Sequence, residues 1–195
     1  MPAGRPRAFD YDQALEQAIN VFWRKGYEGT SMPDLTEAMG MNRPSIYASF
    51  GNKEELFRKA IERYSEVAVA FFTEALDRPT VRESVENFLM ASAGSYACQE
   101  KPRGCLAVQG ALACSEEAQA VKEEALRRRE MVVDVLDERF KRGVREKELS
   151  ADTNTRELAR FYTTVLQGMS IQSTGDVCCD DLKAIARNAL KALPC

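Results

Sequence analysis

The fold is decided by residues 30–57, which read TSMPDLTEAMGMNRPSIYASFGNKEELF. Ser31 can cap a short helix whose apolar residues recur at helical spacing until Gly40. After a tight turn, Asn42 can cap a second short helix that ends before Gly51. Two short helices joined by a three-residue turn that contains glycine predict a helix-turn-helix.

The rest of the chain also has helical periodicity, without a convincing alternating strand. A helix at about residues 10–25 precedes the motif, and a long helix opens at Asn52, with Glu55 in the reciprocal capping position. Further helices are expected from residue 80, over residues 105–114, over roughly thirty residues from Ser115 with a basic end at residues 139–147, and over residues 155–173 and 181–193. We therefore predict an all-α fold of about nine helices in two domains, residues 1–53 and residues 54–195.

Composition excludes several classes of function. The 195 residues contain 27 Lys and Arg against 30 Asp and Glu, so a uniformly basic surface for nucleic acid is excluded, although a local basic site is not. Histidine is absent, which removes Ser-His-Asp and Cys-His catalysis and most zinc sites. The six cysteines form no C-x-x-C pair, so we expect neither metal nor cofactor. No apolar run is long enough to cross a membrane, and we expect a cytoplasmic protein.

The second short helix of the motif has the composition of a DNA-reading helix. Between Ala38 and Lys53 the only charged residues are Arg43 and Lys53, and there is no acid. A helix that enters a major groove about 12 Å wide needs an exposed face that is small, polar and free of acid. A generic solvated helix would be expected to carry an acidic residue here, so this pattern favours DNA binding.

The motif closely resembles the DNA-binding segment of the tetracycline-repressor (TetR) family of bacterial regulators. The resemblance rests on Gly26-Tyr27 before Thr30-Ser31, on Gly40, on Ile46-Tyr47-x-x-Phe50, and on Lys53-Glu54-x-Leu56-Phe57. It implies that Thr30, Ser31 and Lys53 contact phosphates, that Asn42, Arg43 and Ser45 face base edges, and that Tyr47 contacts the backbone or a thymine methyl. Pro44 departs from the small, helix-favouring residue usual in the family; it removes a donor N–H and stiffens the first turn, so the set of base contacts stays open.

The N-terminal residues add a separate indication. Arg5 and Arg7 flank Pro6 in an arm that suits a narrow, A·T-rich minor groove, although a solvated tail would have the same composition.

For the second domain, the resemblance implies a homodimer, which binds a palindromic operator in double-stranded DNA and pairs through its last two helices. It also implies a cavity for a small-molecule inducer of unknown identity, and the absence of a buried charge cluster favours a neutral, hydrophobic or electrophilic one. For each candidate lining residue, ordinary core is the simpler interpretation. The candidates are Phe72, Phe88, Tyr96, Cys105, Met131 and Tyr162.

Cys105 also suggests regulation through a thiol. It follows Lys101-Pro102-Arg103-Gly104, and a helix start beside cations would stabilise its thiolate, with Cys98 or Cys114 as resolving thiol. The sequence therefore predicts a transcriptional regulator, most simply a repressor, that an inducer or modification of Cys105 releases from DNA. An activator has the same sequence pattern. The alternative from another class is a helical thiol-dependent redox enzyme that uses Cys105, but without His or C-x-x-C we expect no enzyme.

Overall fold

The computed structural model describes residues 10–97, 102–112 and 114–194, and these residues form helices and turns without a strand. The all-α prediction is confirmed. The α-helices are α1 (Tyr11–Gly29), α2 (Met32–Met39), α3 (Arg43–Phe50), α4 (Lys53–Leu76), α5 (Val81–Tyr96), α6 (Leu106–Gln109), α7 (Gln119–Arg145), α8 (Thr155–Gln172) and α9 (Cys179–Ala189). Two short 3₁₀ turns, Glu116–Ala118 and Leu190–Ala192, precede α7 and follow α9.

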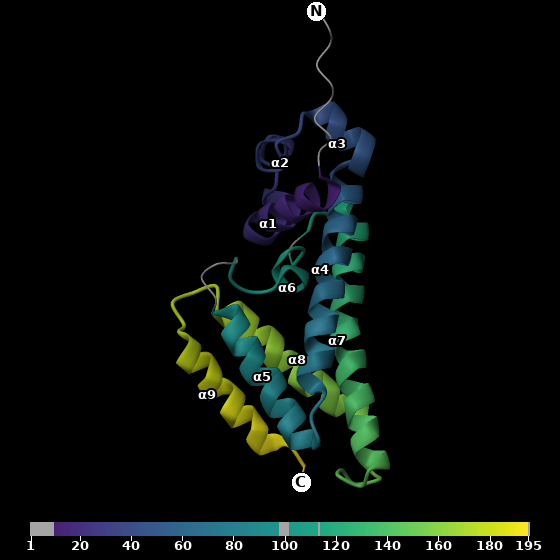
Figure 1. Ribbon diagram of the computed structural model, residues 1–195, viewed down its shortest axis with the longest axis vertical. Helices are drawn as coiled ribbons and strands as arrows, with labels where there is room; N and C mark the ends of the chain where they lie inside the picture. The colour runs from purple at the N-terminus through teal and green to yellow at the C-terminus, as the bar shows by residue number, and fades with distance from the viewer. Residues whose placement is uncertain (1–9, 98–101, 113, 195) are drawn as a thin grey trace, which may run out of the picture.

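Helices α1, α2 and α3 form a small domain at one end of the molecule (Figure 1). Their apolar faces bury Phe22, Leu35, Ile46 and Phe50 together with Phe57 from the start of α4. Because all five side chains are at most 1% exposed, this core fixes the angle between α2 and α3.

The sequence-predicted caps of this domain are present. Ser31 and Asp34 form a reciprocal capping box at the start of α2, and the Asn42 side chain accepts a hydrogen bond from the Ser45 amide at 2.9 Å. Gly40 adopts the left-handed conformation (φ 64°, ψ 25°) in the turn between α2 and α3. A residue with a Cβ would be strained there, so glycine permits the tight turn of the motif.

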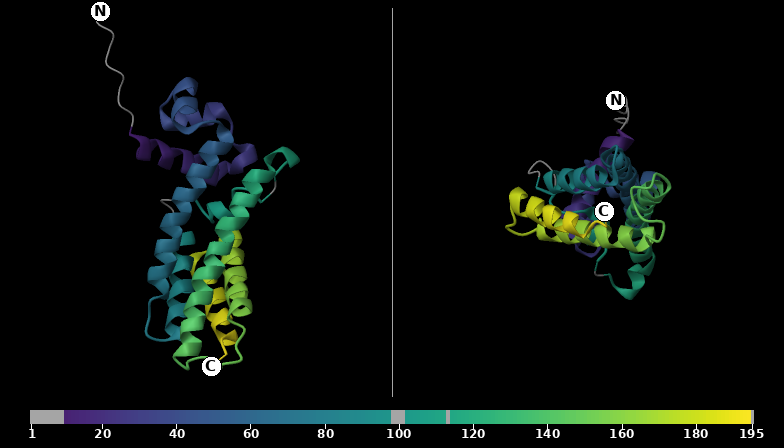
Figure 2. Two further views of the ribbon diagram at one scale, coloured as in Figure 1. Left: turned by 90° about the vertical axis from the view of Figure 1, so that its right-hand side faces the viewer. Right: turned by 90° about the horizontal axis from the view of Figure 1, so that it is seen from below.

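Helix α4 leaves the small domain and continues into the larger one. In Figure 1 it runs beside α7. α5 packs against α4 and α8 packs against α7, while α9 packs on α5 and α8 at the side away from the two long helices (Figures 1 and 2). The core of this bundle contains Phe72, Phe88, Phe140 and Tyr162. One unbroken helix therefore joins both domains, and a displacement of the C-terminal half of α4 would be transmitted to α3.

The segment before α7 differs from the prediction. The helix expected over residues 105–114 is only the four-residue α6, and Gly110 and the turn that follows end it. Ser115 makes no side-chain cap, and its amide instead donates to the Glu28 carboxylate of α1 at 2.8 Å. Spacing within this segment could not reveal that contact, because it joins residues far apart in sequence. Among the described residues, no helix has the length and apolar character needed to cross a membrane.

Candidate nucleic-acid interface and effector cavity

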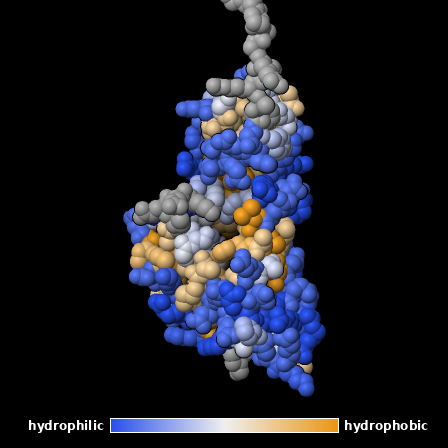
Figure 3. Space-filling model, viewed as in Figure 1, coloured by the Kyte–Doolittle hydropathy of each residue, from blue (hydrophilic) through white to orange (hydrophobic). Residues whose placement is uncertain are grey.

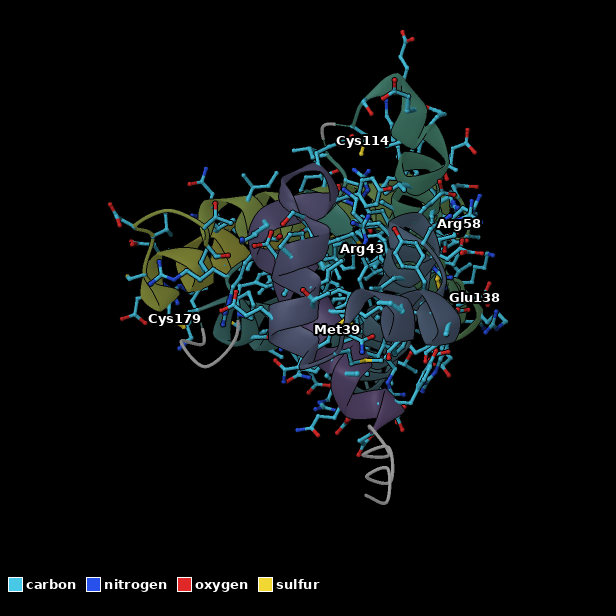
Figure 4. The ribbon with its side chains drawn as sticks, turned by 90° about the horizontal axis from the view of Figure 1, so that it is seen from above. Met39, Arg43, Arg58, Cys114, Glu138 and Cys179 are labelled. Atoms are coloured by element: carbon cyan, nitrogen blue, oxygen red, sulfur yellow. The ribbon has the colours of Figure 1, made fainter. Side chains whose placement is uncertain are left out.

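Helix α3 presents an exposed surface at the end of the molecule, as the view from above in Figure 4 shows with Arg43 labelled. Arg43, Pro44 and Tyr47 are exposed, and Tyr47 retains 43% of its accessible surface. The Arg43 guanidinium donates to the Tyr47 hydroxyl at 3.3 Å and lies 5.6 Å from the centre of the ring. An arginine and a phenol are thus held together on an acid-free face, which suits contacts to base edges and phosphates.

The polar side chains at the starts of α2 and α3 already make hydrogen bonds within the small domain. The Asn42 oxygen caps α3, and the Ser31 hydroxyl donates to the Asp34 carboxylate at 2.8 Å. Ser45 is half-buried beside them. Ser31 lies at the N-terminal end of α2, and Asn42 and Ser45 lie at that of α3; their contacts to DNA remain predictions.

Thr30 and Lys53 hold the small domain together from within. Thr30 is 2% exposed, and its hydroxyl donates to the Gly26 carbonyl at 2.6 Å, so this side chain is engaged within its own domain and its phosphate contact stays a prediction. The Lys53 ammonium donates to the carbonyls of Tyr27 and Thr30, both at 3.0 Å, and lies 4.2 Å from the centre of the Tyr27 ring. A phosphate contact of Lys53 would have to use its third N–H, and that contact stays a prediction. Arg5 and Arg7 lie outside the described residues.

The small domain bends at its junction with the bundle. Gly26 interrupts α1 with φ 68° and ψ 174°, and the following Tyr27 amide donates to the Gly110 carbonyl at 2.7 Å. Gln109 connects the same two segments, because its amide group donates to the Trp23 carbonyl at 3.2 Å and to the Arg103 carbonyl at 2.9 Å. The segment that follows Cys105 is therefore bonded directly to the DNA-binding domain.

A cavity of about 440 Å³ lies where α1, α4 and α5 meet. In Figure 3, hydrophobic residues gather around a hollow between the small domain and the bundle. Its lining residues come from both domains. They are Glu16, Ile19, Asn20 and Trp23 of α1, Arg63, Tyr64, Val67, Ala68, Phe71 and Phe72 of α4, and Ser92, Ser95 and Tyr96 of α5.

The predicted inducer residues divide into two groups. Phe72 and Tyr96 line this cavity. Phe88 and Tyr162 do not line it. Phe88 is fully buried against Phe72, with ring centroids 5.2 Å apart, and the buried Tyr162 hydroxyl donates to the Ala189 carbonyl at 3.3 Å. These two side chains fill the bundle core. Met131 is partly buried on α7, where its sulfur lies 3.9 Å from an Arg128 nitrogen.

Cys105 is not one of the residues that line the cavity, but it is hydrogen-bonded to Tyr64, which lines it. Burial raises the pKa of the Cys105 thiol, even though the Tyr64 bond and nearby backbone amides act in the opposite direction. The expected stabilised thiolate is therefore wrong: the thiol is desolvated, and its neutral form is favoured. Burial also raises the pKa of Cys114, the proposed resolving thiol. Cys98 lies outside the described residues.

The residues that sequence reasoning missed are Trp23, Tyr64 and Gln109. Trp23 and Tyr64 meet edge to face, with ring centroids 4.9 Å apart, across the junction of α1 and α4. Both rings follow the apolar stripes of their helices, so a signal for burial was present, but nothing marked them as a cavity wall. The hydrogen bond from Gln109 to the Trp23 carbonyl joins residues 86 positions apart, so local sequence pattern could not predict it.

An exposed, acid-free second helix in a helix-turn-helix, joined to a helical domain with a cavity, defines a DNA-binding transcriptional regulator. Family models agree over both domains: residues 14–60 match the bacterial regulatory proteins of the tetR family, and residues 79–177 match the tetracyclin repressor-like C-terminal domain. The chain belongs to the TetR family of transcriptional regulators. Its relatives are regulators, and the alternative of a redox enzyme is not supported.

Individual relatives extend the match to nearly the whole chain. The transcriptional repressor ComR of Escherichia coli is 32% identical and covers 98% of this chain and 92% of its own length. The repressor BdcR of the same organism is 34% identical over 55% of each chain. A solved structure of the TetR family regulator CifR, a cysteine mutant bound to 26-bp operator DNA, is 43% identical and superposes with a TM-score of 0.94. It covers 98% of this chain and all of its own.

Proposed function

We propose that this regulator is a homodimeric repressor, which binds a palindromic operator and dissociates when an effector occupies the regulatory domain. The observation that carries this proposal is the acid-free α3 face, on which Arg43 and Tyr47 are exposed and joined by a hydrogen bond. The structural similarity to CifR bound to operator DNA supports the same orientation of α3 toward DNA. The division into a DNA-binding unit, residues 1–53, and a regulatory unit, residues 54–195, belongs to this proposal.

In this proposal the contacts to DNA come from two sources. Arg43 reads base edges in the major groove, flanked by Asn42, Pro44 and Ser45, while Tyr47 contacts the backbone or a thymine methyl. Ser31 and the remaining ammonium N–H of Lys53 contact phosphates. Arg5 and Arg7 are proposed to enter the minor groove. These last contacts concern residues beyond those the structure describes.

Dimerisation is proposed to use α8 and α9. Phe161 and Ile171 of α8 are 41% and 47% exposed, and Ile185 of α9 is 37% exposed, although all three are large apolar residues. A second copy that covers these side chains would bury them. It would also place two α3 helices one DNA turn apart, about 34–36 Å, which a palindrome requires.

Release from DNA is proposed to follow either an inducer in the cavity of α1, α4 and α5 or modification of Cys105. CifR, for comparison, was crystallised with cysteine substitutions. In this chain, the bonds between the Cys105 segment and α1 would carry either change to the small domain. Both routes bias one equilibrium between a DNA-competent and a DNA-incompetent dimer.

Fluorescence anisotropy on labelled DNA from upstream of the protein's own gene tests the proposal, with and without diamide or reductant. Specific, salt-sensitive binding that competitor DNA of random sequence does not abolish is the expected result. Phe161→Glu is expected to give monomers by light scattering and to lose specific binding, whereas Leu112→Glu, at a 57% exposed position outside α8 and α9, is expected to do neither. Binding of equal strength to operator and random DNA would overturn the proposal.

A further inference from the structure

A cleft of about 480 Å³ lies between α7 and α8, and it shares no lining residue with the cavity of α1, α4 and α5. The two helices run side by side (Figure 2). Each contributes a stripe of residues three or four positions apart, which is the spacing of a single helix face. The stripe of α7 contains Leu126, Arg129, Glu130 and Val133, with Arg127 beside it, and the stripe of α8 contains Arg160, Thr163, Thr164 and Gln167.

Positive charge predominates in the lining of this cleft. The guanidinium groups of Arg127, Arg129 and Arg160 line it together with one carboxylate, that of Glu130. The Glu130 carboxylate accepts from Arg160 at 2.9 and 3.1 Å and from Arg156 at 3.0 Å. Because two guanidinium groups already compensate its charge, Glu130 does not make the cleft unfavourable for an anion.

Arg129 is the cation of the cleft that lacks an acidic partner. Arg127 and Arg160 each pair with a glutamate. Arg129 is half-buried, and its Nε donates to the Ala125 carbonyl at 3.4 Å, but none of the ion pairs among the described residues includes it. A guanidinium group presents several N–H donors in a fixed fork that matches a carboxylate. Arg129 therefore has both charge and donors available for an anion.

The Thr163 hydroxyl gives a second, independent indication of a ligand. Thr163 lines the cleft, yet it is only 4% exposed, and its hydroxyl has no hydrogen-bond partner within the described part of the chain. The hydroxyl of the neighbouring Thr164, by contrast, donates to the Arg160 carbonyl at 2.8 Å. A buried hydroxyl without a partner is unfavourable, so we expect an atom from outside the chain to accept from Thr163.

Apolar side chains complete the cleft. Leu126 remains 45% exposed on α7, and Val133 lines the cleft one face-repeat further along the same helix. We propose that the cleft binds a small carboxylate with a compact apolar body, whose carboxylate contacts Arg129 and Thr163 and whose body packs on Leu126 and Val133. One unpaired guanidinium group balances one negative charge, so a monocarboxylate suits the cleft better than a phosphate dianion. This inference goes beyond the proposed function and does not depend on it.

Isothermal titration of the full-length protein with benzoate, in a buffer free of phosphate and other carboxylates, tests the class of ligand. Benzoate is expected to bind saturably at one site per chain. Benzamide has the same ring without the charge, and inorganic phosphate has the charge without the apolar body, so each is expected to bind at least tenfold more weakly. Absence of saturable benzoate binding, or equal binding of either comparison compound, would overturn the proposed class.

Two substitutions test the location. Arg129→Gln is expected to lower benzoate affinity at least tenfold, whereas Arg145→Gln, at an exposed position of the same helix outside the cleft, is expected to leave it unchanged. Thr163→Val is expected to lower the affinity at least threefold without lowering Tm, because it removes a buried polar group that has no partner among the described residues. If Arg129→Gln loses its helical circular dichroism, Arg129→Lys removes the fork and keeps the charge, and at least threefold weaker binding is expected. Unchanged benzoate affinity in the folded variants would overturn the site.

Thermal unfolding separates this cleft from the cavity at the domain junction. A ligand that binds only the folded chain raises its Tm, so saturating benzoate is expected to stabilise the natural protein and not Arg129→Gln. Arg63 is the arginine that lines the cavity of α1, α4 and α5, and Arg63→Gln is expected to retain the increase in Tm. An increase that Arg63→Gln abolishes and Arg129→Gln retains would place benzoate in that cavity and overturn the proposal.

Discussion

Removal of the Lys53 side chain should destabilise the DNA-binding domain, which gives the clearest test of how that domain is held. The ammonium group joins the start of α4 to the end of α1 through two bonds of 3.0 Å, to the carbonyls of Tyr27 and Thr30. It also lies 4.2 Å from the centre of the Tyr27 ring. Lys53→Ala removes all three interactions at once and leaves two carbonyls at the domain junction without this donor.

The expected loss follows from the nature of these contacts. A hydrogen bond that involves a charged group contributes about 1.5–3 kcal/mol, and a cation–π contact at a partly exposed site contributes about 0.5–1 kcal/mol. Lys53 is half-buried, so water recovers part of this energy in the variant. We therefore expect the free energy of unfolding to fall by about 2–3 kcal/mol, and Tm to fall by roughly 4–12 °C for a chain of this length.

Urea unfolding followed by Trp23 fluorescence measures this loss, because the single tryptophan lies in α1, next to the affected junction. Lys59→Ala is the matched control on the same helix. Its ammonium is 3.5 Å from the Ser49 carbonyl and 5.9 Å from the centre of the Phe50 ring, so we expect a loss below about 1 kcal/mol. A Lys53→Ala loss no larger than that of Lys59→Ala would refute the assigned role.

The same variant tests the predicted phosphate contact under conditions in which it stays folded. If the third N–H of Lys53 binds a phosphate, Lys53→Ala weakens operator and random DNA alike and lowers the salt slope of binding by about 0.9. An unchanged salt slope would confine Lys53 to its internal role.

Three further predictions concern other parts of the chain. Arg43→Ala is expected to weaken operator binding by about 1–3 kcal/mol and random DNA far less; equal losses in anisotropy titrations would contradict a base contact. A hydrogen bond from Lys25, with others from Ser31, lowers the pKa of Asp34 to about 2. The ionised Asp34 carboxylate therefore stabilises the fold above about pH 4, and this contribution is lost as the pH falls from about 4 to 2. The difference in urea midpoint between the natural chain and Asp34→Asn should disappear across that window, and a constant difference would refute this. In a variant whose only cysteine is Cys105, this thiol should react with a chromogenic disulfide at pH 7.5 at least tenfold more slowly than free cysteine, and the reaction should accelerate above pH 9. A rate equal to that of free cysteine would contradict a desolvated thiol.

The helix-turn-helix could be predicted from sequence because its determinants are local. Ser31 and Asn42 cap the helices that follow them, and Gly40 lies in the turn between those helices. Each signal acts within about four residues, which is the range over which spacing and capping chemistry determine helix ends. The same reasoning identified the exposed face of α3, because the acid-free composition of a short helix is visible directly in its sequence.

The roles of Thr30 and Lys53 were harder to predict because one side chain can serve two purposes. A threonine or lysine beside a helix-turn-helix can bind a phosphate or satisfy carbonyls of its own domain, and composition is the same in either case. Here the kink at Gly26 frees carbonyls at the end of α1, and these carbonyls accept from both side chains. The decision depends on the backbone path of the preceding helix, which local pattern does not specify.

The regulatory junction depends on long-range contacts and could not be derived from pattern. A basic run before Cys105 suggested a stabilised thiolate, yet the Arg103 guanidinium donates to the Gly175 carbonyl at 2.7 Å, and the thiol is desolvated beside Tyr64. The proximity of a cation in sequence therefore did not predict the electrostatics of the thiol. The α6 segment that follows Cys105 is bonded to α1 through Gln109, a contact between residues 86 positions apart. α4 offers a second path to α3, because it runs from the end of α3 into the bundle without a break, so local pattern alone cannot tell through which helix a change in the bundle would reach α3.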